Sequence, residues 1–305
     1  MTGMFMSPGL VNLPYFDRIL ESLRNGDIEV AEAFSRYVHW GFWDDTSRAD
    51  GSLRDFAQAA ERMSQRVIEA GQVCSGQRVL DVGCGFGGTL ADLNQRFDGM
   101  ELVGLNIDPR QLDHARRDPA LAAREGNRIT LLTGDACRLP FVAASFDVIL
   151  CVEAVFHFPG RDRFLHEVRR VLRPGGRLAL SDFVPRFVIP FLWDYFDRRF
   201  KPVVTRLYGA SDMRCTVNHY RQLARHAGLE LTRVHDVTNN TLPSYRVLRS
   251  LVQRIAPDPV GAEQVIRRVE FTTRIGLLRY LILIFEELAI AGNPSSPPTV
   301  RTFTE

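Results

Sequence analysis

The spacing of hydrophobic positions changes along the chain and divides it into five segments. Residues 1–75 carry apolar side chains three and four apart, which predicts amphipathic helices over 15–23, 28–37 and 52–70. The remaining segments are 76–185, where short apolar runs alternate with helical spacing, then 186–215, 216–290 and 291–305. We expect them to form, in order, an N-terminal helical lid, the main core, a cap, the C-terminal part of the core with a helical insertion, and a flexible tail.

Strand and helix patterns alternate from residue 78 onward. The predicted strands are 79–82, 101–107, 129–133, 146–152, 178–183, 230–237 and 279–285. The predicted helices are 90–97, 109–117, 164–172, 220–227, 241–255 and 261–273. Alternation of this kind indicates an α/β protein whose parallel sheet has helices on both faces. A ligand crevice is then expected beyond the carboxyl ends of the strands.

Composition and charge narrow the classes of partner. The chain has 305 residues, 45% hydrophobic and 24% charged, as in one ordinary globular unit. Its net charge of +2 comes from 38 basic and 36 acidic residues that form no long block, so we expect neither nucleic acid nor acidic lipid as a partner. The most apolar stretch, 275–290, contains Arg279, Glu286 and Glu287, which argues against a membrane span.

Cysteine usage and the start of the chain bear on its compartment. The five cysteines lie far apart, without a CxxC pair or the histidine spacing of a zinc site. We therefore expect reduced thiols in the cytoplasm and no metal centre. Residues 1–15 lack the basic start and sustained apolar run of a signal peptide.

A glycine-rich stretch at 78–89 follows the first predicted strand directly. Gly83, Gly85 and Gly88 match the GxGxxG spacing of dinucleotide-binding loops, a match that is weak by itself. The stretch lies well inside the chain, and Asp81 stands two positions before the first glycine. Further ligand-type residues follow the ends of later strands, among them Asp135. Together these features argue against a nicotinamide-dependent enzyme.

With these motifs the chain resembles the class I S-adenosylmethionine-dependent methyltransferases over residues 79–285. The acid and GxGxG motif of that family corresponds to Asp81, Gly83, Gly85 and Gly87. The glycine, acid and leucine-proline step before its fourth strand, and the turn before its fifth, correspond to Gly134, Asp135, Ala136, Leu139 and Pro140, and to Leu172, Arg173, Pro174, Gly175 and Gly176. The resemblance implies a Rossmann-like, doubly wound, seven-stranded sheet with an antiparallel last strand, an N-terminal helical lid and helical cap insertions.

The resemblance also implies S-adenosyl-L-methionine as the cofactor. Its expected binding residues are Asp81, Gly83, Gly85, Gly87, Asn106, Ile107, Gln111, Asp135 and Ala136. The Asp135 carboxylate would accept from the adenine amino group while the Ala136 amide donates to the ring. Asn106 departs from the family pattern, in which an acid takes both ribose hydroxyls; an amide can accept from one and donate to the other. Asp108 could replace it only if the turn is displaced.

The catalytic candidates follow the fourth strand. The segment from Glu153 to His157 resembles the Glu-Ser-x-His-His type of small-molecule O-methyltransferases, with Phe156 in place of the first histidine. His157 is the expected general base, because its ordinary pKa lies near neutrality, and Glu153 or Asp182 would orient its ring. A purely structural role for His157 at the edge of the crevice is the alternative. Of the other histidines only His39 is a candidate worth testing.

Aromatic segments suggest the acceptor. The run from His39 to Trp43 and the apolar segment 187–200 favour a lipophilic small molecule such as a polyketide or macrocycle, with Trp43, Phe156 and Trp193 as substrate-binding candidates; ordinary core packing of these rings is the alternative. O-methylation in secondary metabolism is the first hypothesis. Methylation of a prenyl or polyketide carbon, with Glu153 and aromatic faces stabilising positive charge, is the second. The third is a methyltransferase-like scaffold that does not methylate, such as a cyclase. A monomer or homodimer is expected.

Overall fold

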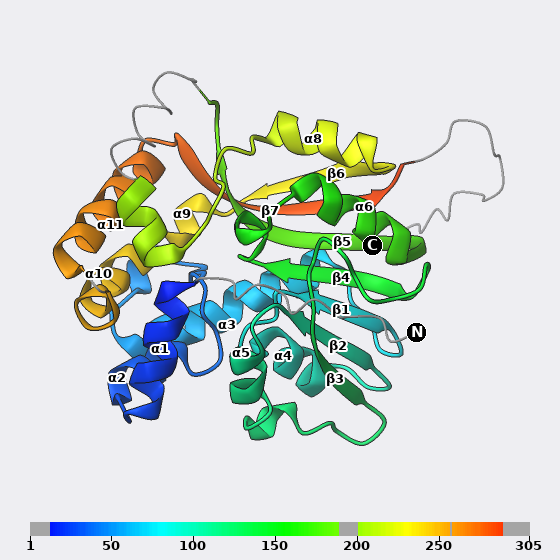
Figure 1. The fold of residues 1–305 in the computed structure, drawn as a ribbon, viewed down its shortest axis with the longest axis horizontal. Helices are drawn as coiled ribbons and strands as arrows, with labels where there is room; N and C mark the ends of the chain where they lie inside the picture. Colours follow the sequence, from blue (N-terminus) through cyan, green and yellow to red (C-terminus); the bar gives the residue numbers. More distant parts are fainter. Residues whose placement is uncertain (1–12, 189–200, 257, 289–305) are drawn as a thin grey trace, which may run out of the picture.

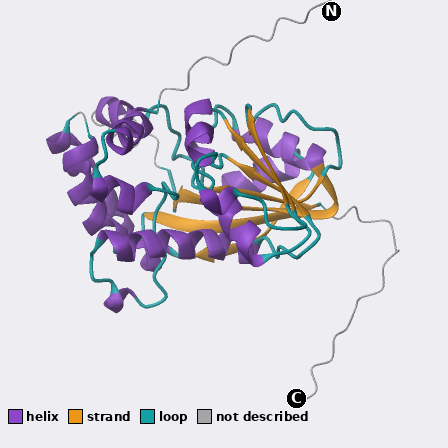
Figure 2. Cartoon of the chain, turned by 90° about the horizontal axis from the view of Figure 1, so that it is seen from below, coloured by secondary structure: helices purple, strands orange, loops and turns teal. Residues whose placement is uncertain are grey.

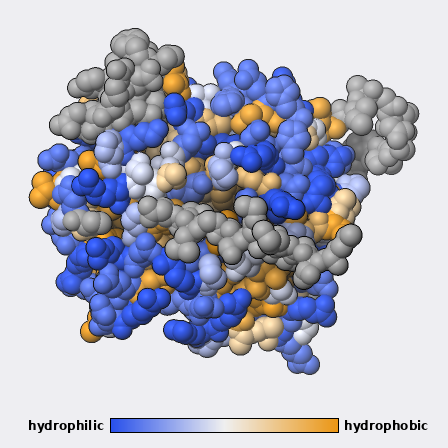
Figure 3. Space-filling model, in the orientation of Figure 1, coloured by the Kyte–Doolittle hydropathy of each residue, from blue (hydrophilic) through white to orange (hydrophobic). Residues whose placement is uncertain are grey.

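The computed structural model describes residues 13–188, 201–256 and 258–288. The substrate-binding candidate Trp193, most of the segment 187–200 and the expected tail at 291–305 lie outside the described residues. In the space-filling view of Figure 3, polar residues predominate on the visible face, and apolar ones gather in small separate patches. None of the helices within the described ranges is long and apolar enough to cross a membrane.

A seven-stranded mixed sheet forms the centre of the molecule, with the order β3-β2-β1-β4-β5-β7-β6 (Figure 1). The strands are β1 (Arg78–Val82), β2 (Glu101–Asn106), β3 (Arg128–Thr133), β4 (Phe146–Val152), β5 (Leu172–Pro185), β6 (Leu229–Asp236) and β7 (Leu278–Glu287). The first five run parallel, and β7 runs antiparallel to both β5 and β6. The Rossmann-like sheet with an antiparallel last strand, expected from the sequence, is therefore confirmed.

Helices cover both faces of this sheet, as Figure 2 shows. On one face α3 (Leu53–Ala70), α4 (Gly88–Arg96) and α5 (Pro109–Ala115) pack through Met63, Leu90 and Leu112. On the other, α6 (Arg161–Val171) and α8 (Val217–His226) pack through Phe164 and Tyr220. The central strands are buried on both faces, which explains their continuous apolar runs.

The remaining helices gather beside the sheet, at the left of Figure 1. They are α1 (Pro14–Arg24), α2 (Ile28–Phe34), α9 (Thr238–Thr241), α10 (Ser244–Ile255), α11 (Pro259–Arg274) and the helical residues 201–208. The described residues also form the single-turn helices η1 (Thr46–Arg48), η2 (Pro119–Leu121) and η3 (Val155–His157). Local signals set several starts: the Asp27 carboxylate caps α2, and the Ser52 hydroxyl caps α3. One apolar cluster joins α1, α2, α3 and α10, so segments far apart in sequence form one layer.

The strand β7 should dominate the stability of the C-terminal half, because it pairs with both β5 and β6. Replacing its fully buried Leu283 by alanine should lower the free energy of unfolding by about 2–5 kcal/mol through lost burial and a cavity. Val234, which faces Leu283 from the edge strand β6 and is 36% exposed, provides the control. Val234→Ala should change stability by about 0.5 kcal/mol or less in urea unfolding; equal losses would contradict this account.

Candidate active site

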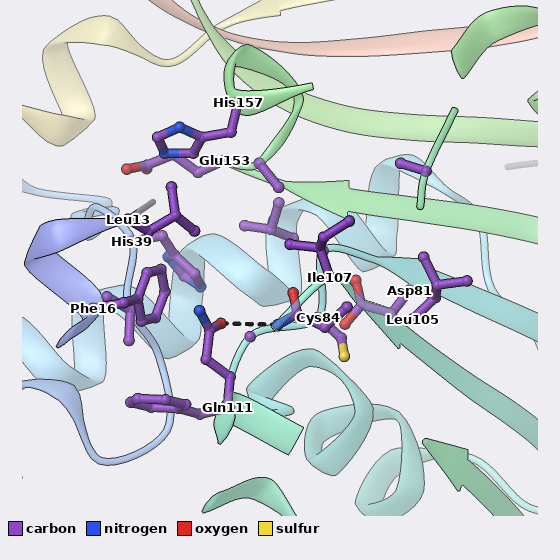
Figure 4. Close-up of a pocket in the computed structure, with 18 of the residues that line it drawn as sticks. Leu13, Phe16, His39, Asp81, Cys84, Leu105, Ile107, Gln111, Glu153 and His157 are labelled. Atoms are coloured by element: carbon purple, nitrogen blue, oxygen red, sulfur yellow. Dashed lines mark hydrogen bonds between the residues drawn. The ribbon is translucent and has the colours of Figure 1, made fainter. Parts of the chain in front are cut away.

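A cleft opens at the carboxyl ends of β1, β2, β3 and β4, where the crossover loops leave the sheet. It encloses about 930 Å³ of space, a figure that includes the part open to solvent. Leu13, Tyr15 and Phe16, at the start of α1, line its outer side together with residues 36–39. Figure 4 shows side chains from the sheet and from the N-terminal helices converging on it.

The glycine-rich loop after β1 forms the floor of the cleft. Gly83, Gly85 and Gly87 have φ of 77°, 52° and 84°, a left-handed conformation that other residues rarely adopt. A Cβ on Gly83 would lie 2.5 Å from the Cβ of Ala154, whereas the position on Gly85 is open apart from Gln111 Oε1 at 3.8 Å. Gly83 and Gly85 line the cleft. Gly87 instead precedes α4 as its N-terminal cap, where an added Cβ would meet Leu121.

Asp81 brings a carboxyl group to this floor from the end of β1. The residue is 2% exposed, and burial raises the pKa of its carboxyl to about 7. Its Oδ2 is buried and has no hydrogen-bond partner within the described part of the chain. A buried oxygen left in this way is unfavourable by about 1–3 kcal/mol, so Asp81 is suited to accept a hydrogen bond from a ligand.

Asn106 and Gln111 face each other across the next strand end. The Asn106 side-chain amide donates to Gln111 Oε1 at 3.1 Å, the dashed line in Figure 4, and to the Asp108 carbonyl at 3.2 Å. The Gln111 amide nitrogen is buried without a partner among the described residues. Asp108 does not replace Asn106, because its carboxylate accepts from the Arg110 backbone at the start of α5 and pairs with the Arg110 guanidinium.

The third strand end supplies the far wall of the cleft. Asp135 and Ala136 line it, as does Ile107. The Asp135 Oδ1 accepts from the Cys137 amide at 2.8 Å, which fixes the carboxylate at the rim. The residues expected from the sequence to bind a cofactor thus meet in one cleft, with Gly87 just outside it.

His157 closes the opposite side of the cleft from the short helix η3. Its Nδ1 lies 3.0 Å from the Ala210 carbonyl oxygen, which can only accept, so this nitrogen carries the proton. Nε2 is therefore unprotonated, and its lone pair can accept from the Tyr15 hydroxyl, which lies 3.4 Å away. Burial lowers the pKa of His157 to about 4 and raises that of Tyr15. The imidazole is neutral at physiological pH.

Glu153 stands beside His157 in a strained conformation. Its φ of 50° is left-handed, which is rare for a residue with a side chain and is often found at functional sites. One carboxyl oxygen accepts from the Tyr280 hydroxyl at 2.7 Å and from the Trp40 amide at 3.0 Å. Burial raises the pKa of Glu153 to about 8. Glu153 therefore faces the cleft as a group that titrates near neutrality.

Three sequence-based expectations need correction. Neither Glu153 nor Asp182 holds the His157 ring, because the Nδ1 partner is the Ala210 carbonyl and Asp182 pairs with Arg161 and Tyr220. Trp43 is 3% exposed, donates to Asp55 at 2.8 Å and packs among the N-terminal helices. Phe156 turns into the core against Phe183. Neither ring is among the described residues that line the cleft.

His39 also lines the cleft, although the sequence analysis assigns it no role and names it only as a histidine worth testing. Its Nδ1 lies 3.1 Å from the Trp40 carbonyl oxygen, so Nε2 is the unprotonated nitrogen. That Nε2 is buried with no partner in the described ranges, and burial lowers the pKa of His39 to about 4. Tyr15 was not anticipated either, since no local pattern shows where α1 packs.

The residues that the structure describes contain no group of three or more histidine, cysteine, aspartate or glutamate side chains that could hold a metal ion. The titratable groups of the cleft are instead carboxyls, imidazoles and phenols in apolar surroundings.

Comparison with known proteins agrees with this arrangement. The family described as methyltransferase domain matches residues 80–180. The methyltransferase GfsG of Streptomyces halstedii is 36% identical over 232 residues, which cover 75% of this chain and 76% of that protein. The 27-O-demethylrifamycin SV methyltransferase of Amycolatopsis mediterranei is 31% identical over 244 residues, covering 79% and 83% respectively.

A solved structure shows the same fold. The geranyl diphosphate C-methyltransferase of Streptomyces coelicolor A3(2), in complex with Mg²⁺, geranyl diphosphate and S-adenosyl-L-homocysteine, superposes with a TM-score of 0.66. The match covers 90% of this chain and 98% of that one at 17% identity. Such low identity supports the fold alone.

The cleft fits S-adenosylmethionine on the observations above. The buried, unpartnered atoms Asp81 Oδ2 and His39 Nε2 are acceptors, and the Gln111 amide nitrogen is a donor. The floor at Gly85 is open to a ligand, because the nearest atom to its Cβ position is Gln111 Oε1 at 3.8 Å. Together they provide hydrogen-bond acceptors and a donor, and the amino-acid and nucleoside parts of the cofactor need both kinds of partner.

The raised pKa of Asp81 predicts that cofactor binding depends on pH. Below about pH 7 the free protein holds a proton on Asp81, which must leave if the carboxylate is to accept from an ammonium group. The affinity for S-adenosylhomocysteine should therefore rise by up to about tenfold per pH unit between pH 5.5 and 7. Calorimetry at pH 6 in buffers of different ionisation enthalpy should detect the released proton.

Asp81→Asn should bind more weakly and lose this proton release, while Asp147→Asn, at the opposite end of β4, should keep both the affinity and the release. Because Glu153 also titrates in the cleft, the Asp81 variant identifies the responsible group. An affinity independent of pH in the unaltered protein would contradict the assignment.

Proposed function

The chain belongs to the S-adenosylmethionine-dependent methyltransferases, and on that premise we propose that it methylates a hydroxyl group of a lipophilic small molecule in the cytoplasm. The observation that carries the proposal is the unprotonated Nε2 of His157, which the Ala210 carbonyl orients at the cleft and which contacts the Tyr15 hydroxyl at 3.4 Å. The name of the rifamycin-related relative supports a natural product as the acceptor.

We assign the cofactor to the three strand ends. The open backbone at Gly85 and the carboxylate of Asp81 would hold its amino-acid part. Asn106 and Gln111 would hold the ribose, with the Gln111 amide nitrogen still free to donate. Asp135 and Ala136 would hold the adenine at the far wall. The bound cofactor supplies an electrophilic methyl group on a sulfonium.

His157 takes the proton of the acceptor hydroxyl in this proposal. The Ala210 carbonyl holds Nδ1–H, which leaves Nε2 as the acceptor and fixes the plane of the ring. When the hydroxyl proton reaches Nε2, the same carbonyl oxygen stabilises the charge on Nδ1–H. The chain therefore contributes chiefly position and a neutral base.

The acceptor side of the cleft is mostly apolar. Leu13, Phe16 and Phe158 line it together with the Tyr15 ring, which stacks on His157 with ring centroids 6.0 Å apart. Tyr208, in the helical residues 201–208, lies against Tyr15 at 5.6 Å. Such a surface favours a lipophilic acceptor that presents one hydroxyl to His157.

Methylation of carbon is the second candidate, favoured by the surroundings of Glu153. Trp40 and Tyr280, whose backbone amide and hydroxyl hold the Glu153 carboxyl, both have rings against Phe183. Because the pKa of Glu153 is about 8, its carboxyl is ionised at alkaline pH, where it and its aromatic neighbours would stabilise positive charge on a carbon chain. The carbon NMR shift of the new methyl group separates the two products. A protein that forms no S-adenosylhomocysteine with any acceptor would instead be a scaffold.

Removing the base should abolish most turnover. In a screen of polyketide alcohols for S-adenosylhomocysteine formation, His157→Ala should lower kcat for any accepted compound by about 10²–10⁴-fold. The affinity for S-adenosylhomocysteine should stay within about twofold, because His157 faces the acceptor side. His166→Ala, on the exposed surface of α6, is the control and should keep kcat. Near-normal turnover of His157→Ala would refute the base.

The pH profile of kcat should carry the signature of a buried histidine. Because burial lowers the pKa of His157 to about 4, the neutral base persists as the pH falls, and kcat should decline only below about pH 5. An ordinary histidine would lose half of its activity near pH 6.5. The measurement is the initial rate between pH 4.5 and 7.5, and circular dichroism at each pH checks that the protein stays folded. Half-loss near pH 6.5 would contradict the assignment.

A further inference from the structure

A buried arginine lies behind the cleft, outside the residues discussed so far as binding or proton-transfer groups. Arg161, at the start of α6, is 6% exposed. Its guanidinium donates to the Tyr220 hydroxyl at 3.0 Å, to Asp182 Oδ2 at 3.1 Å and to Asp212 Oδ2 at 3.1 Å. It also donates to the Asp212 carbonyl at 2.6 Å. We call Arg161, Asp182, Tyr220 and Asp212 the Arg161 cluster.

The inner half of this cluster is fixed to the core. Asp182 lies on β5 and is fully buried, and its Oδ2 also accepts from the Tyr220 hydroxyl at 2.6 Å. Tyr220, on α8, is fully buried as well. Removing one partner of such a set leaves a buried charge uncompensated, which is strongly unfavourable. The guanidinium therefore has a single well-defined position.

The outer half of the cluster reaches the connection between the helical residues 201–208 and α8. Arg161 holds both the side chain and the carbonyl of Asp212, a residue whose carboxylate is 51% exposed. The Asp212 amide in turn donates to the Phe156 carbonyl at 2.8 Å. Two residues earlier, the Ala210 carbonyl receives the Nδ1–H of His157. The connection thus links the buried arginine to η3 at two points, the Phe156 carbonyl and the His157 ring.

A buried ion pair contributes little net stability compared with apolar packing, so stability alone is a weak reason to place one here. What the cluster fixes is the path of residues 209–216, which are not held in a helix or strand. The position of one carbonyl in this path decides which nitrogen of His157 carries the proton. A displacement of about 1 Å at such a contact can change a rate by about 10²-fold.

We propose that Arg161, Asp182, Tyr220 and Asp212 are positioning residues that hold the Ala210 carbonyl against His157 and so select its Nε2 as the base. The inference rests on the proposed function, because it gives His157 a role in proton transfer. None of the four residues lines the cleft among the described positions, so they act through the backbone of 209–216. A cluster that serves stability alone would leave the His157 ring unchanged when it is weakened.

The test uses variants of the Arg161 cluster, beginning with the half-exposed Asp212 and ending with the fully buried Asp182. Asp212→Asn removes the charge of the half-exposed carboxylate, and Tyr220→Phe removes one hydroxyl while keeping the ring. Asp182→Asn is the most disruptive variant, and the first two keep the test valid if it does not fold. The control is Asp147→Asn, because the Asp147 carboxylate is also partly exposed and pairs with an arginine, Arg173, at 2.8 Å.

The readout is NMR of the protein labelled with ¹⁵N in its histidine rings, with His157 assigned from the spectrum of His157→Gln. The unaltered protein should show the Nδ1–H form of His157. In Asp212→Asn and Tyr220→Phe this form should be mixed with the other tautomer, and kcat should fall about 10-fold to 10²-fold with the KM for the cofactor within about twofold. Asp147→Asn should match the unaltered protein.

Unchanged His157 resonances in folded Asp212→Asn and Tyr220→Phe would overturn the proposal, whatever their stability. The ring signal needs no acceptor, so it is independent of the proposed reaction. If the ring changes while His157→Ala keeps normal turnover, the positioning role holds and the base assignment fails. The two failures are therefore distinguishable.

Discussion

The burial of polar groups at the carboxyl ends of parallel strands is the constraint on which the site depends. Strands β1, β2 and β4 end at one edge of the sheet, and their last residues line one cleft. Asp81 and Gln111 each keep a buried polar atom there without a partner among the described residues. Such atoms weaken the free fold and are satisfied when a polar ligand binds, so stability and binding are coupled.

The two histidines of the cleft have the same kind of hydrogen-bond partner and the same protonation state. His39 and His157 each present Nδ1 to a backbone carbonyl, and burial keeps both rings neutral. A carbonyl oxygen fixes the tautomer, and the hydrogen bond to it raises the pKa of the ring by less than burial lowers it. The cleft therefore combines neutral imidazoles with carboxyls that titrate near neutrality, an arrangement compatible with a positively charged cofactor.

The sequence predicts the site residues that lie at the ends of strands. It does not predict those whose place depends on the direction of a side chain or on packing between distant segments. Asp81, Asn106, Asp135 and their neighbours could be placed because motif and strand end coincide. Trp43 and Asp182 could not, because each follows a local pattern that says nothing about which way the side chain turns. Tyr15 and Ala210 reach His157 from segments 142 and 53 residues away in sequence, and no periodicity reports such contacts.

Because Tyr15 contacts His157, an acceptor that binds at Nε2 must displace the Tyr15 hydroxyl. A phenol hydroxyl already lies at Nε2, so an incoming hydroxyl replaces one hydrogen bond of about the same strength with another and gains almost nothing from that bond. The free energy that favours the acceptor must then come from the rest of the molecule, through contacts with the apolar wall. Compounds that share the reactive hydroxyl but lack the lipophilic body should lose this competition to the protein's own side chain.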